Sequence, residues 1–203
     1  MTGAAAARTV SGRIAYRSGT GAETGSERFE IVSHPDGHVL RAFCDLASIG
    51  LLRDVSIAFD RDWRPIDGFC RIIKAGSVAA SSWFCIEPGA VEIEARLAGA
   101  GRVQQRLPLD APLAYLGLHP LQGDALIAMV RGTDDPGRFV AIPALTNSVS
   151  PNGDEGLTGT HVNIDVAFIG DESVTVAAGH FAARRYALRW RADWPAADLW
   201  VRA

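Results

Sequence analysis

Hydrophobic and polar residues alternate with a period of two through most of this chain, as in β-strands with one buried face. The alternation is clearest at 91–97, where aliphatic residues at odd positions are separated by charged residues at even positions. Glycine, proline and aspartate bound each such run, and they predict turns. The same pattern predicts further strands at 13–17, 28–33, 38–46, 51–60, 66–74, 78–87, 102–107, 161–169, 173–178, 181–190 and 198–202.

The links between the strands of the first half are short. A parallel crossover needs about a dozen residues or more, so we expect an antiparallel meander there. The links at 170–171 and 179 are interpreted as turns of the same kind. A flat sheet of about twelve strands would leave long unpaired edges. The predicted fold class is therefore all-β: a large curved antiparallel sheet, either an open barrel or a β-roll, with at most one short helix.

The alternation fails between 108 and 160, where prolines and glycines are frequent. Within this segment, 124–131 fits either a short helix or an apolar strand. The tract 146–156 is the most loop-like part of the chain, and we expect it to be mobile because it has little to bury. We divide the chain into an N-terminal tail at 1–10 and a single antiparallel β domain at 11–203, with an irregular insert at about 108–160.

Composition narrows the class of protein without identifying a function. The 203 residues are 48% hydrophobic and 21% charged, with a net charge of −3, which is typical of a soluble globular protein. The basic residues are dispersed and balanced by 23 acids, so we expect no nucleic-acid partner. No apolar run has the length of a membrane span, and the alanines at 4–7 are too few for a secretory segment. The default expectation is a cytoplasmic protein.

The three cysteines do not form a metal or disulfide pattern. Cys44, Cys70 and Cys85 lack C-x-x-C spacing, and each follows a phenylalanine, so we expect buried, inert thiols. The sequence also lacks the motifs of elbow-type serine hydrolases, zincins, P-loop NTPases and EF-hands. We therefore predict no metal site and no cofactor.

The C-terminal part carries a recognisable pattern. A strand with a valine pair, 174–176, runs through Ala178-Gly179 and Phe181 into a basic strand, before the strand containing Trp200-Val201. This run resembles uncharacterised bacterial domains built as one large curled antiparallel sheet, similar in general shape to the LolA/LolB lipoprotein-carrier architecture. The match covers roughly the last forty residues, and elsewhere it rests on strand count. The resemblance implies an apolar ligand held in the concave face.

One candidate catalytic group lies in the irregular segment, where loops on a rigid sheet often carry chemistry. His119 could act as a general acid or base, oriented by Asp124 and assisted by the Tyr115 hydroxyl. The structural alternative is that His119 caps a turn and Asp124 is the N-cap of a short helix.

A second candidate is the strand 161–169, where His161, Asn163 and Asp165 share one face. If that face lines a cavity, these residues could transfer protons or bind a metal. If it faces water, they are the outer surface of an antiparallel strand, which is the commoner situation.

Arginines and aromatic residues supply the remaining binding candidates. Four arginines lie in strands among residues expected to be buried: Arg41, Arg53, Arg71 and Arg185. Each needs an acceptor, either a ligand carboxylate or an aspartate on a neighbouring strand: Asp45, Asp54, Asp60 or Asp67. Several aromatic residues could line a pocket or fill the core: Trp63, Trp83, Phe84, Tyr186, Trp190, Trp194 and Trp200. The predicted substrate-binding residues are Arg41, Arg71, Arg185, Tyr186, Trp83, His161 and Asp165.

Three functions fit these observations. The first is binding of a small hydrophobic or aromatic molecule, with or without a carboxylate, in the cavity of a curved sheet. The second is a cofactor-independent lyase or decarboxylase acting on an aromatic carboxylic acid, with an arginine such as Arg41 or Arg71 holding the carboxylate and Tyr115 or His119 moving the proton. The third is a scaffold or interaction subunit, for which a homodimer is the simplest assembly.

Overall fold

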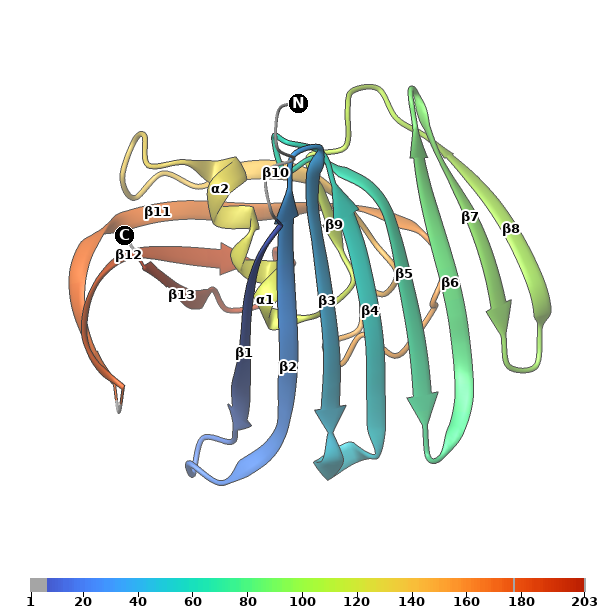
Figure 1. Cartoon of the computed structure of the whole chain (residues 1–203), viewed down its shortest axis with the longest axis horizontal. Coiled ribbons are helices and arrows are strands. Elements are labelled where there is room, and N and C mark those ends of the chain that lie inside the picture. Colours follow the sequence, from blue (N-terminus) through green and yellow to red (C-terminus); the bar gives the residue numbers. More distant parts are fainter. Residues whose placement is uncertain (1–6, 177, 203) are drawn as a thin grey trace, which may run out of the picture.

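The structure is a computed structural model that describes residues 7–176 and 178–202. Within these residues, most of the chain is strand, and the strands form two sheets (Figure 1). The first is an antiparallel meander of eight strands in sequence order: β1 (Arg8–Arg17), β2 (Glu23–His34), β3 (Gly37–Leu46), β4 (Leu51–Phe59), β5 (Pro65–Lys74), β6 (Ser77–Glu87), β7 (Ala90–Leu97) and β8 (Gly101–Pro108). The predicted meander is confirmed. Strand β1 begins inside the stretch expected to be a tail, and residues 1–6 of that stretch lie outside the described residues.

Tight turns explain why these strands pair antiparallel. Lys74 pairs with Ser77, so only Ala75 and Gly76 lie between β5 and β6. Both turn residues have positive φ, 49° and 77°, as in the type I′ turn, whose twist matches that of the flanking strands. A link of two residues brings the chain straight back beside itself, as the sequence predicted.

The second sheet has five strands in the described part of the chain, in the order β13 (Ala197–Arg202), β12 (Gly179–Arg189), β11 (Thr160–Val176), β10 (Val140–Thr146) and β9 (Tyr115–Gly117). Its pairs are antiparallel except β9 with β10, which is parallel. The predicted all-β, curved, antiparallel fold is confirmed, with the strands divided between two sheets. Strands β9 and β10 lie in the segment predicted to be irregular: β9 is very short, and Pro143 interrupts the strand pattern of β10.

The turn expected at 170–171 is wrong. Strand β11 continues through it for 17 residues, and its pairing with β12 shifts register between Phe168 and Gly170. Gly170 has φ of 153° and forms part of a bulge, which bends a strand without ending it. A glycine in a strand pattern signals either a turn or a bulge, and only the pairing partner distinguishes the two. The long strand curves visibly at one side of the molecule (Figure 1).

The ambiguous segment at 124–131 is helical. Helices α1 (Leu121–Ala125) and α2 (Ile127–Arg131) are separated by Leu126, and a 3₁₀ turn, η1 (Ala47–Ile49), follows β3. Asp124 lies inside α1, so the idea that Asp124 is the N-cap is wrong; Pro120 occupies the N-cap position. None of the helices among the described residues has the length and apolar character needed to cross a membrane.

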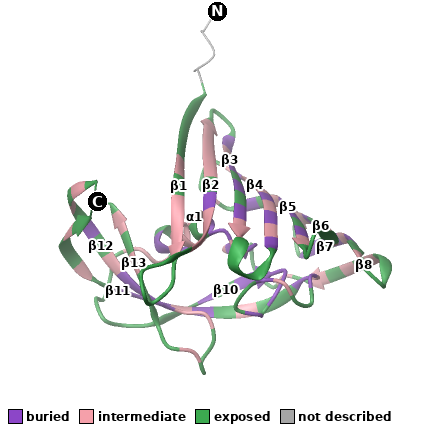
Figure 2. Ribbon diagram, turned by 90° about the horizontal axis from the view of Figure 1, so that it is seen from below, coloured by how far each residue is buried: buried purple, intermediate pink, exposed green. Residues whose placement is uncertain are grey.

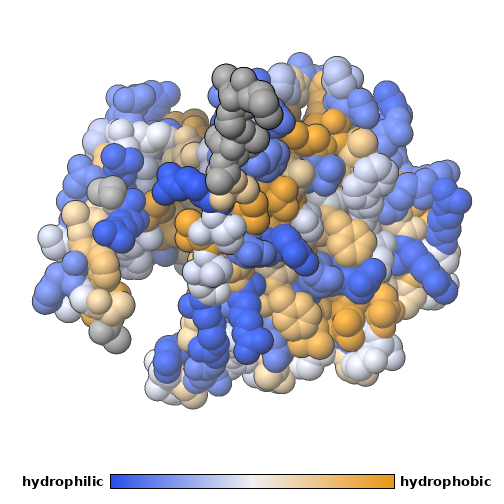
Figure 3. Space-filling model, in the orientation of Figure 1, coloured by the Kyte–Doolittle hydropathy of each residue, from blue (hydrophilic) through white to orange (hydrophobic). Residues whose placement is uncertain are grey.

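The core lies where the two sheets face each other, as the buried segments in Figure 2 show. One cluster packs the inner face of the first sheet against five leucines of the second half of the chain: Leu113, Leu116, Leu118, Leu145 and Leu157. The other packs the second sheet against α2 through Ile127 and Ala128. The outer face of the first sheet mixes charged and exposed apolar side chains (Figure 3).

The tract 146–156 is irregular, as predicted, but the expectation that it has little to bury is wrong. Thr146, Asn147, Ser148 and Ser150 are all buried. The hydroxyls of Thr146, Ser148 and Ser150 bond to one another or to nearby backbone groups: the Ser148 and Ser150 oxygens lie 3.1 Å apart, and the amide of Asp154 donates to Ser150 Oγ at 3.0 Å. Hydrogen bonds between close neighbours therefore allow a polar segment to be buried between the sheets.

Gly68 marks a close approach between the first sheet and the segment 116–118, and it gives a stability prediction. A β-carbon at Gly68 would lie 2.6 Å from Leu116 Cδ2 and 3.0 Å from Leu118 Cδ1. We expect Gly68→Ala to lower the free energy of unfolding by about 1–3 kcal/mol, because overpacking forces the neighbouring side chains to move. The matched control is Gly19→Ala, where nothing lies within 4 Å. Urea denaturation of both variants measures the effect, and equal stability of the two would contradict this account of the packing.

Candidate functional site

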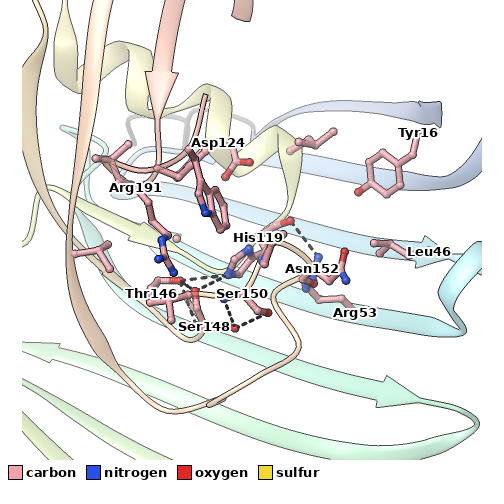
Figure 4. A pocket seen from close by; sticks show the side chains of 18 of the residues that line it. Tyr16, Leu46, Arg53, His119, Asp124, Thr146, Ser148, Ser150, Asn152 and Arg191 are labelled. Atoms are coloured by element: carbon pink, nitrogen blue, oxygen red, sulfur yellow. Dashed lines mark hydrogen bonds between the residues drawn. The ribbon is translucent and has the colours of Figure 1, made fainter. Parts of the chain in front are cut away.

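A cavity of about 350 Å³ lies between the sheets (Figure 4). Its residues come from β1, the start of β2, the end of β3, η1, β4, the β9–α1 region, the β10–β11 loop, β11 and the β12–β13 connection. The lining residues are Tyr16, Thr24, Leu46, Ser48, Arg53, Gly117, His119, Leu121, Asp124, Thr146, Ser148, Val149, Ser150, Pro151, Asn152, Val162, Ile164, Trp190, Arg191 and Trp194.

A buried carboxylate holds one wall of the cavity in place. Glu27 of β2 is completely buried and accepts hydrogen bonds from the backbone amides of Leu121 at 2.7 Å and Gln122 at 3.0 Å. The Tyr16 hydroxyl also donates to Glu27, at 2.8 Å. The first amides of a helix have no partner within the helix, and here a side chain from another element satisfies them. Glu27 therefore fixes α1 against the first sheet.

A buried guanidinium holds the adjoining backbone. Arg53 of β4 is 3% exposed, and it donates to the backbone oxygen of His119 at 3.1 Å and to that of Asn152. Within the described residues, Arg53 forms no salt bridge, and its buried Nε has no hydrogen-bond partner. Arg53 is thus a buried cation that contacts neutral carbonyls rather than a carboxylate.

These two charges lie on one row of the first sheet. Glu27 pairs with Cys44, and Cys44 pairs with Arg53, so two interstrand spacings, about 10 Å, separate their backbones. All three side chains are buried on the same face. Burial raises the pKa of the intervening Cys44 thiol to about 11. Cys44 and Cys70 are thus buried thiols, as expected, whereas Cys85 is partly exposed.

His119 has a strained backbone and a fixed imidazole. Its φ is 68°, although it precedes Pro120, where an extended conformation is favoured. Nε2 lies 2.9 Å from the carbonyl oxygen of Ser148, and a carbonyl can only accept, so Nε2 carries the proton. Burial and the Arg53 charge lower the pKa of His119 to about 4. The ring is neutral at pH 7, and Nδ1 carries its lone pair.

Asp124 and Tyr115 form the other ionisable pair at the cavity. The Tyr115 hydroxyl donates to Asp124 Oδ1 at 3.0 Å. Oδ2 forms no hydrogen bond with any of the described residues, and Asp124 borders the cavity. Burial raises the pKa of Asp124 to about 7 and raises that of Tyr115 well above its usual range. Near neutral pH, Asp124 is therefore present in both protonation states.

The remaining walls are largely apolar. Val162 and Ile164 of β11 face the cavity, together with Val149 and the indoles of Trp190 and Trp194. Arg191 also borders the cavity, and its guanidinium is paired with Asp193 at 2.9 Å and stacked over Trp194. A concave site that combines apolar walls with polar groups able to orient a ligand is the usual form of a small-molecule site.

The predicted catalytic residues come together, since Tyr115 contacts Asp124, and both His119 and Asp124 line the cavity. The predicted binding arginines lie elsewhere. Arg41 and Arg71 are exposed, and Arg71 lies 4.0 Å from Asp54. Arg185 is paired with Asp198 at 3.0 Å. These two ion pairs are of the cross-strand kind weighed in the sequence analysis, although Asp198 was not among the partners named there.

The other predicted binding residues also lie outside the cavity lining. Tyr186 is buried in the core against Phe168, with ring centroids 5.4 Å apart. Trp83 is 45% exposed. His161 is exposed, and Asp165 lies 3.9 Å from Arg189, while the apolar side of the same strand lines the cavity.

Sequence reasoning missed several groups that line the cavity or support its wall, each for a local reason. Glu27 lies in a strand that carries charged residues on both of its faces, so its sequence position does not show that it is buried. Ser148 and Ser150 lie in the loop tract, where serine is expected. Their spacing of two, in register with Thr146, was the available signal of one shared inner face. Among residues 7–176 and 178–202, no group of three or more His, Cys, Asp or Glu is arranged to hold a metal ion.

The fold has a counterpart among solved structures. The crystal structure of a β-barrel-like protein of domain of unknown function DUF1849 from Brucella abortus superposes with a TM-score of 0.53 and 10% identity, covering 92% of this chain and 79% of that one. No protein-family model matches this sequence, and no curated protein matches it. The likeness supports the expected bacterial curled β domain as a fold. Similarity to LolA/LolB is not shown.

The opposite shifts of His119 and Asp124 predict how stability depends on pH. The pKa of His119 is about 6.5 in the unfolded chain and about 4 in the folded protein. Between these pH values only the unfolded chain binds the proton, so this group makes the folded protein more stable as the pH rises from about 4 to 6.5. The pKa of Asp124 is near 4 in the unfolded chain and about 7 in the folded protein. Between these pH values only the folded protein binds the proton, so this group makes the folded protein less stable as the pH rises from about 4 to 7. The two effects oppose each other.

We expect Asp124→Asn to leave the His119 effect alone, so that the free energy of unfolding rises with pH between about 4 and 6.5, by up to about 1.4 kcal/mol per unit relative to the parent. His119→Asn should show the reverse, a fall between about 4 and 7. Chemical denaturation across this range measures both slopes. Parallel pH profiles for the two variants and the parent would disprove the assignment.

Proposed function

We propose that the cavity binds a small hydrophobic or aromatic molecule that bears a carboxylate. The observation that carries this proposal is Arg53, a buried guanidinium without a contacting carboxylate at the boundary of a largely apolar cavity. A charge in such a place is costly unless an opposite charge accompanies it. A ligand carboxylate supplies that charge, and the aliphatic and indole walls accommodate the remainder of the ligand.

The field of Arg53 reaches the interior of the cavity. Its charge lowers the pKa of both His119 and Asp124, and these two residues lie on the cavity wall. The same field favours any negative group placed beside them. The carboxylate end of the ligand is therefore assigned to the Arg53–His119 side, and the apolar end to Trp190 and Trp194.

The resemblance of the C-terminal run to curled β domains implies an apolar ligand on the concave side of a sheet, and the ligand proposed here is of that kind. We place the ligand of this chain between its two sheets.

A homodimer belongs to the proposals as well, and size-exclusion chromatography with light scattering tests it directly.

A ligand series tests the binding proposal. We expect 3-phenylpropanoate and decanoate to bind at least ten times more tightly than 3-phenylpropanamide and decanol, measured by calorimetry at pH 6.5. Arg53→Met, which keeps the length of the side chain, should remove this preference. Arg41→Met, an exposed arginine outside the cavity, is the matched control and should behave like the parent.

The parent protein alone also decides the matter if Arg53→Met fails to fold. Equal affinity for the acids and their uncharged counterparts would remove the carboxylate from the proposal. Failure of all four compounds to bind would remove the binding function itself.

A second candidate function, a cofactor-independent lyase acting on an aromatic carboxylic acid, is favoured by Asp124. A cavity-facing carboxyl with a pKa of about 7 is suited to giving and taking protons near neutral pH. In this scheme Arg53 takes the carboxylate-holding role that Arg41 or Arg71 was expected to have.

The lyase candidate predicts turnover that depends on Asp124. If the parent consumes an aromatic acid from the ligand series, Asp124→Asn should lower kcat by a factor of about 100 or more while binding persists, and His119→Ala should show whether the imidazole contributes. Product formation is followed by chromatography. Unchanged acids after prolonged incubation with the parent would leave the site as a binding site only.

A further inference from the structure

Asp124 gives the cavity an ionisable carboxyl group in addition to the Arg53 charge. Asp124 faces the cavity with one carboxyl oxygen tied to Tyr115 and the other without a partner among the described residues. Arg53 contributes positive charge to the same space. A ligand carboxylate drawn in by Arg53 therefore comes to lie in one small cavity with a second carboxyl group.

We propose that Asp124 and the ligand carboxylate share one proton, so that the site takes up its acid together with a proton. This inference rests on the proposed function. Two carboxylates in one poorly solvated site cannot both remain ionised cheaply, and one of them takes up a proton. Protonated Asp124 Oδ2 then donates a hydrogen bond to the ligand carboxylate, which accepts it. No bond to carbon is made or broken, and the proton comes from solvent.

The groups around Asp124 leave it as the one that responds near neutral pH. On its own side, Tyr115 donates to it and His119 is neutral, with a pKa of about 4. From the first sheet, the charge of Glu27 raises the pKa of Asp124, and that of Arg53 lowers it. Tyr16 stays neutral because burial raises its pKa far above the usual range. Arg191, on the β12–β13 connection, is already paired with Asp193.

Coupling of this kind gives a defined pH dependence. Below pH about 7 Asp124 already carries its proton, so binding takes up none. Above that pH, each binding event must recruit a proton, and affinity falls as protons become scarce. The Kd for a carboxylate should therefore rise by about tenfold per pH unit above the pKa of free Asp124, following simple linkage. An uncharged ligand should show no such dependence.

The experiment is titration calorimetry with 3-phenylpropanoate in pairs of buffers that differ in ionisation enthalpy. At pH 8.5 the parent should take up close to one proton per ligand, and at pH 5.5 close to none. Asp124→Asn has an amide that can still donate to the ligand. Its Kd should not change with pH between 6.5 and 8.5, and binding should take up no proton. Arg41→Met serves as the control and should match the parent.

Tyr115→Phe separates a specific role from a general disturbance. The Tyr115 hydroxyl lowers the pKa of Asp124 by donating to its ionised form. Its removal should raise that pKa, so that the onset of proton uptake moves to higher pH while the stoichiometry at still higher pH remains one. A merely structural role would weaken binding equally at every pH.

The outcomes distinguish the two proposals. Binding of the carboxylate with a Kd that stays flat to pH 8.5 and no proton uptake would overturn the shared proton and leave the binding function intact. Proton uptake that persists in Asp124→Asn would assign the proton to another group and overturn the role of Asp124. Absence of carboxylate binding at every pH would overturn both.

Discussion

Two buried charges of opposite sign hold the second half of the molecule onto the first. Glu27 and Arg53 lie on one row of the first sheet, with Cys44 between them. Glu27 accepts from the amides that begin α1, and Arg53 donates to the carbonyl of His119, just before that helix. The backbone from 119 to 122 is thus held at both ends: the amides of 121 and 122 donate to Glu27, and the carbonyl of 119 accepts from Arg53. A charged group makes stronger hydrogen bonds than a neutral one, and these groups reach backbone that no strand pairs with.

This constraint sets the chemistry of the cavity. It keeps His119 in a backbone conformation that a residue before proline avoids, with the imidazole against the 146–153 loop. Gly153 allows that approach, because a β-carbon there would lie 2.6 Å from His119 Cγ and 2.7 Å from Arg53 Nη2. The same exclusion of water then acts in opposite directions on the two ionisable groups. It keeps His119 uncharged by lowering its pKa and keeps Asp124 partly protonated by raising its own. In the function proposed here, the Arg53 charge at the boundary of this cavity is what draws in an anion.

The first sheet could be predicted almost strand by strand because its central strands alternate buried and more exposed residues and short turns join them. The second sheet could be predicted only in part. Pro143 concealed β10, Gly170 signalled a turn where β11 bulges, and three residues are too few for β9 to show a period. Among the site residues, Tyr115, His119 and Asp124 are close in sequence, and their grouping was visible. Arg53 was noticed as one of four arginines, yet the period of its strand could not say which of the four would be buried without an acid, since that depends on what the other sheet places opposite.

The cavity is assembled from segments that are far apart in the chain, so it places more demands on the sequence than the course of the strands does. The protein from Brucella abortus has a similar course of the chain at 10% identity, which requires only that alternation and turns be kept. The cavity requires more: an acid on β2, an arginine on β4, a glycine at 153 and a helix start at 121 must all be present together. Replacing any one leaves the strands able to pair but removes a support for the others. Function in this architecture is therefore decided by a few buried polar residues on the inner faces, while the alternating pattern that builds the sheets is free to serve other sites.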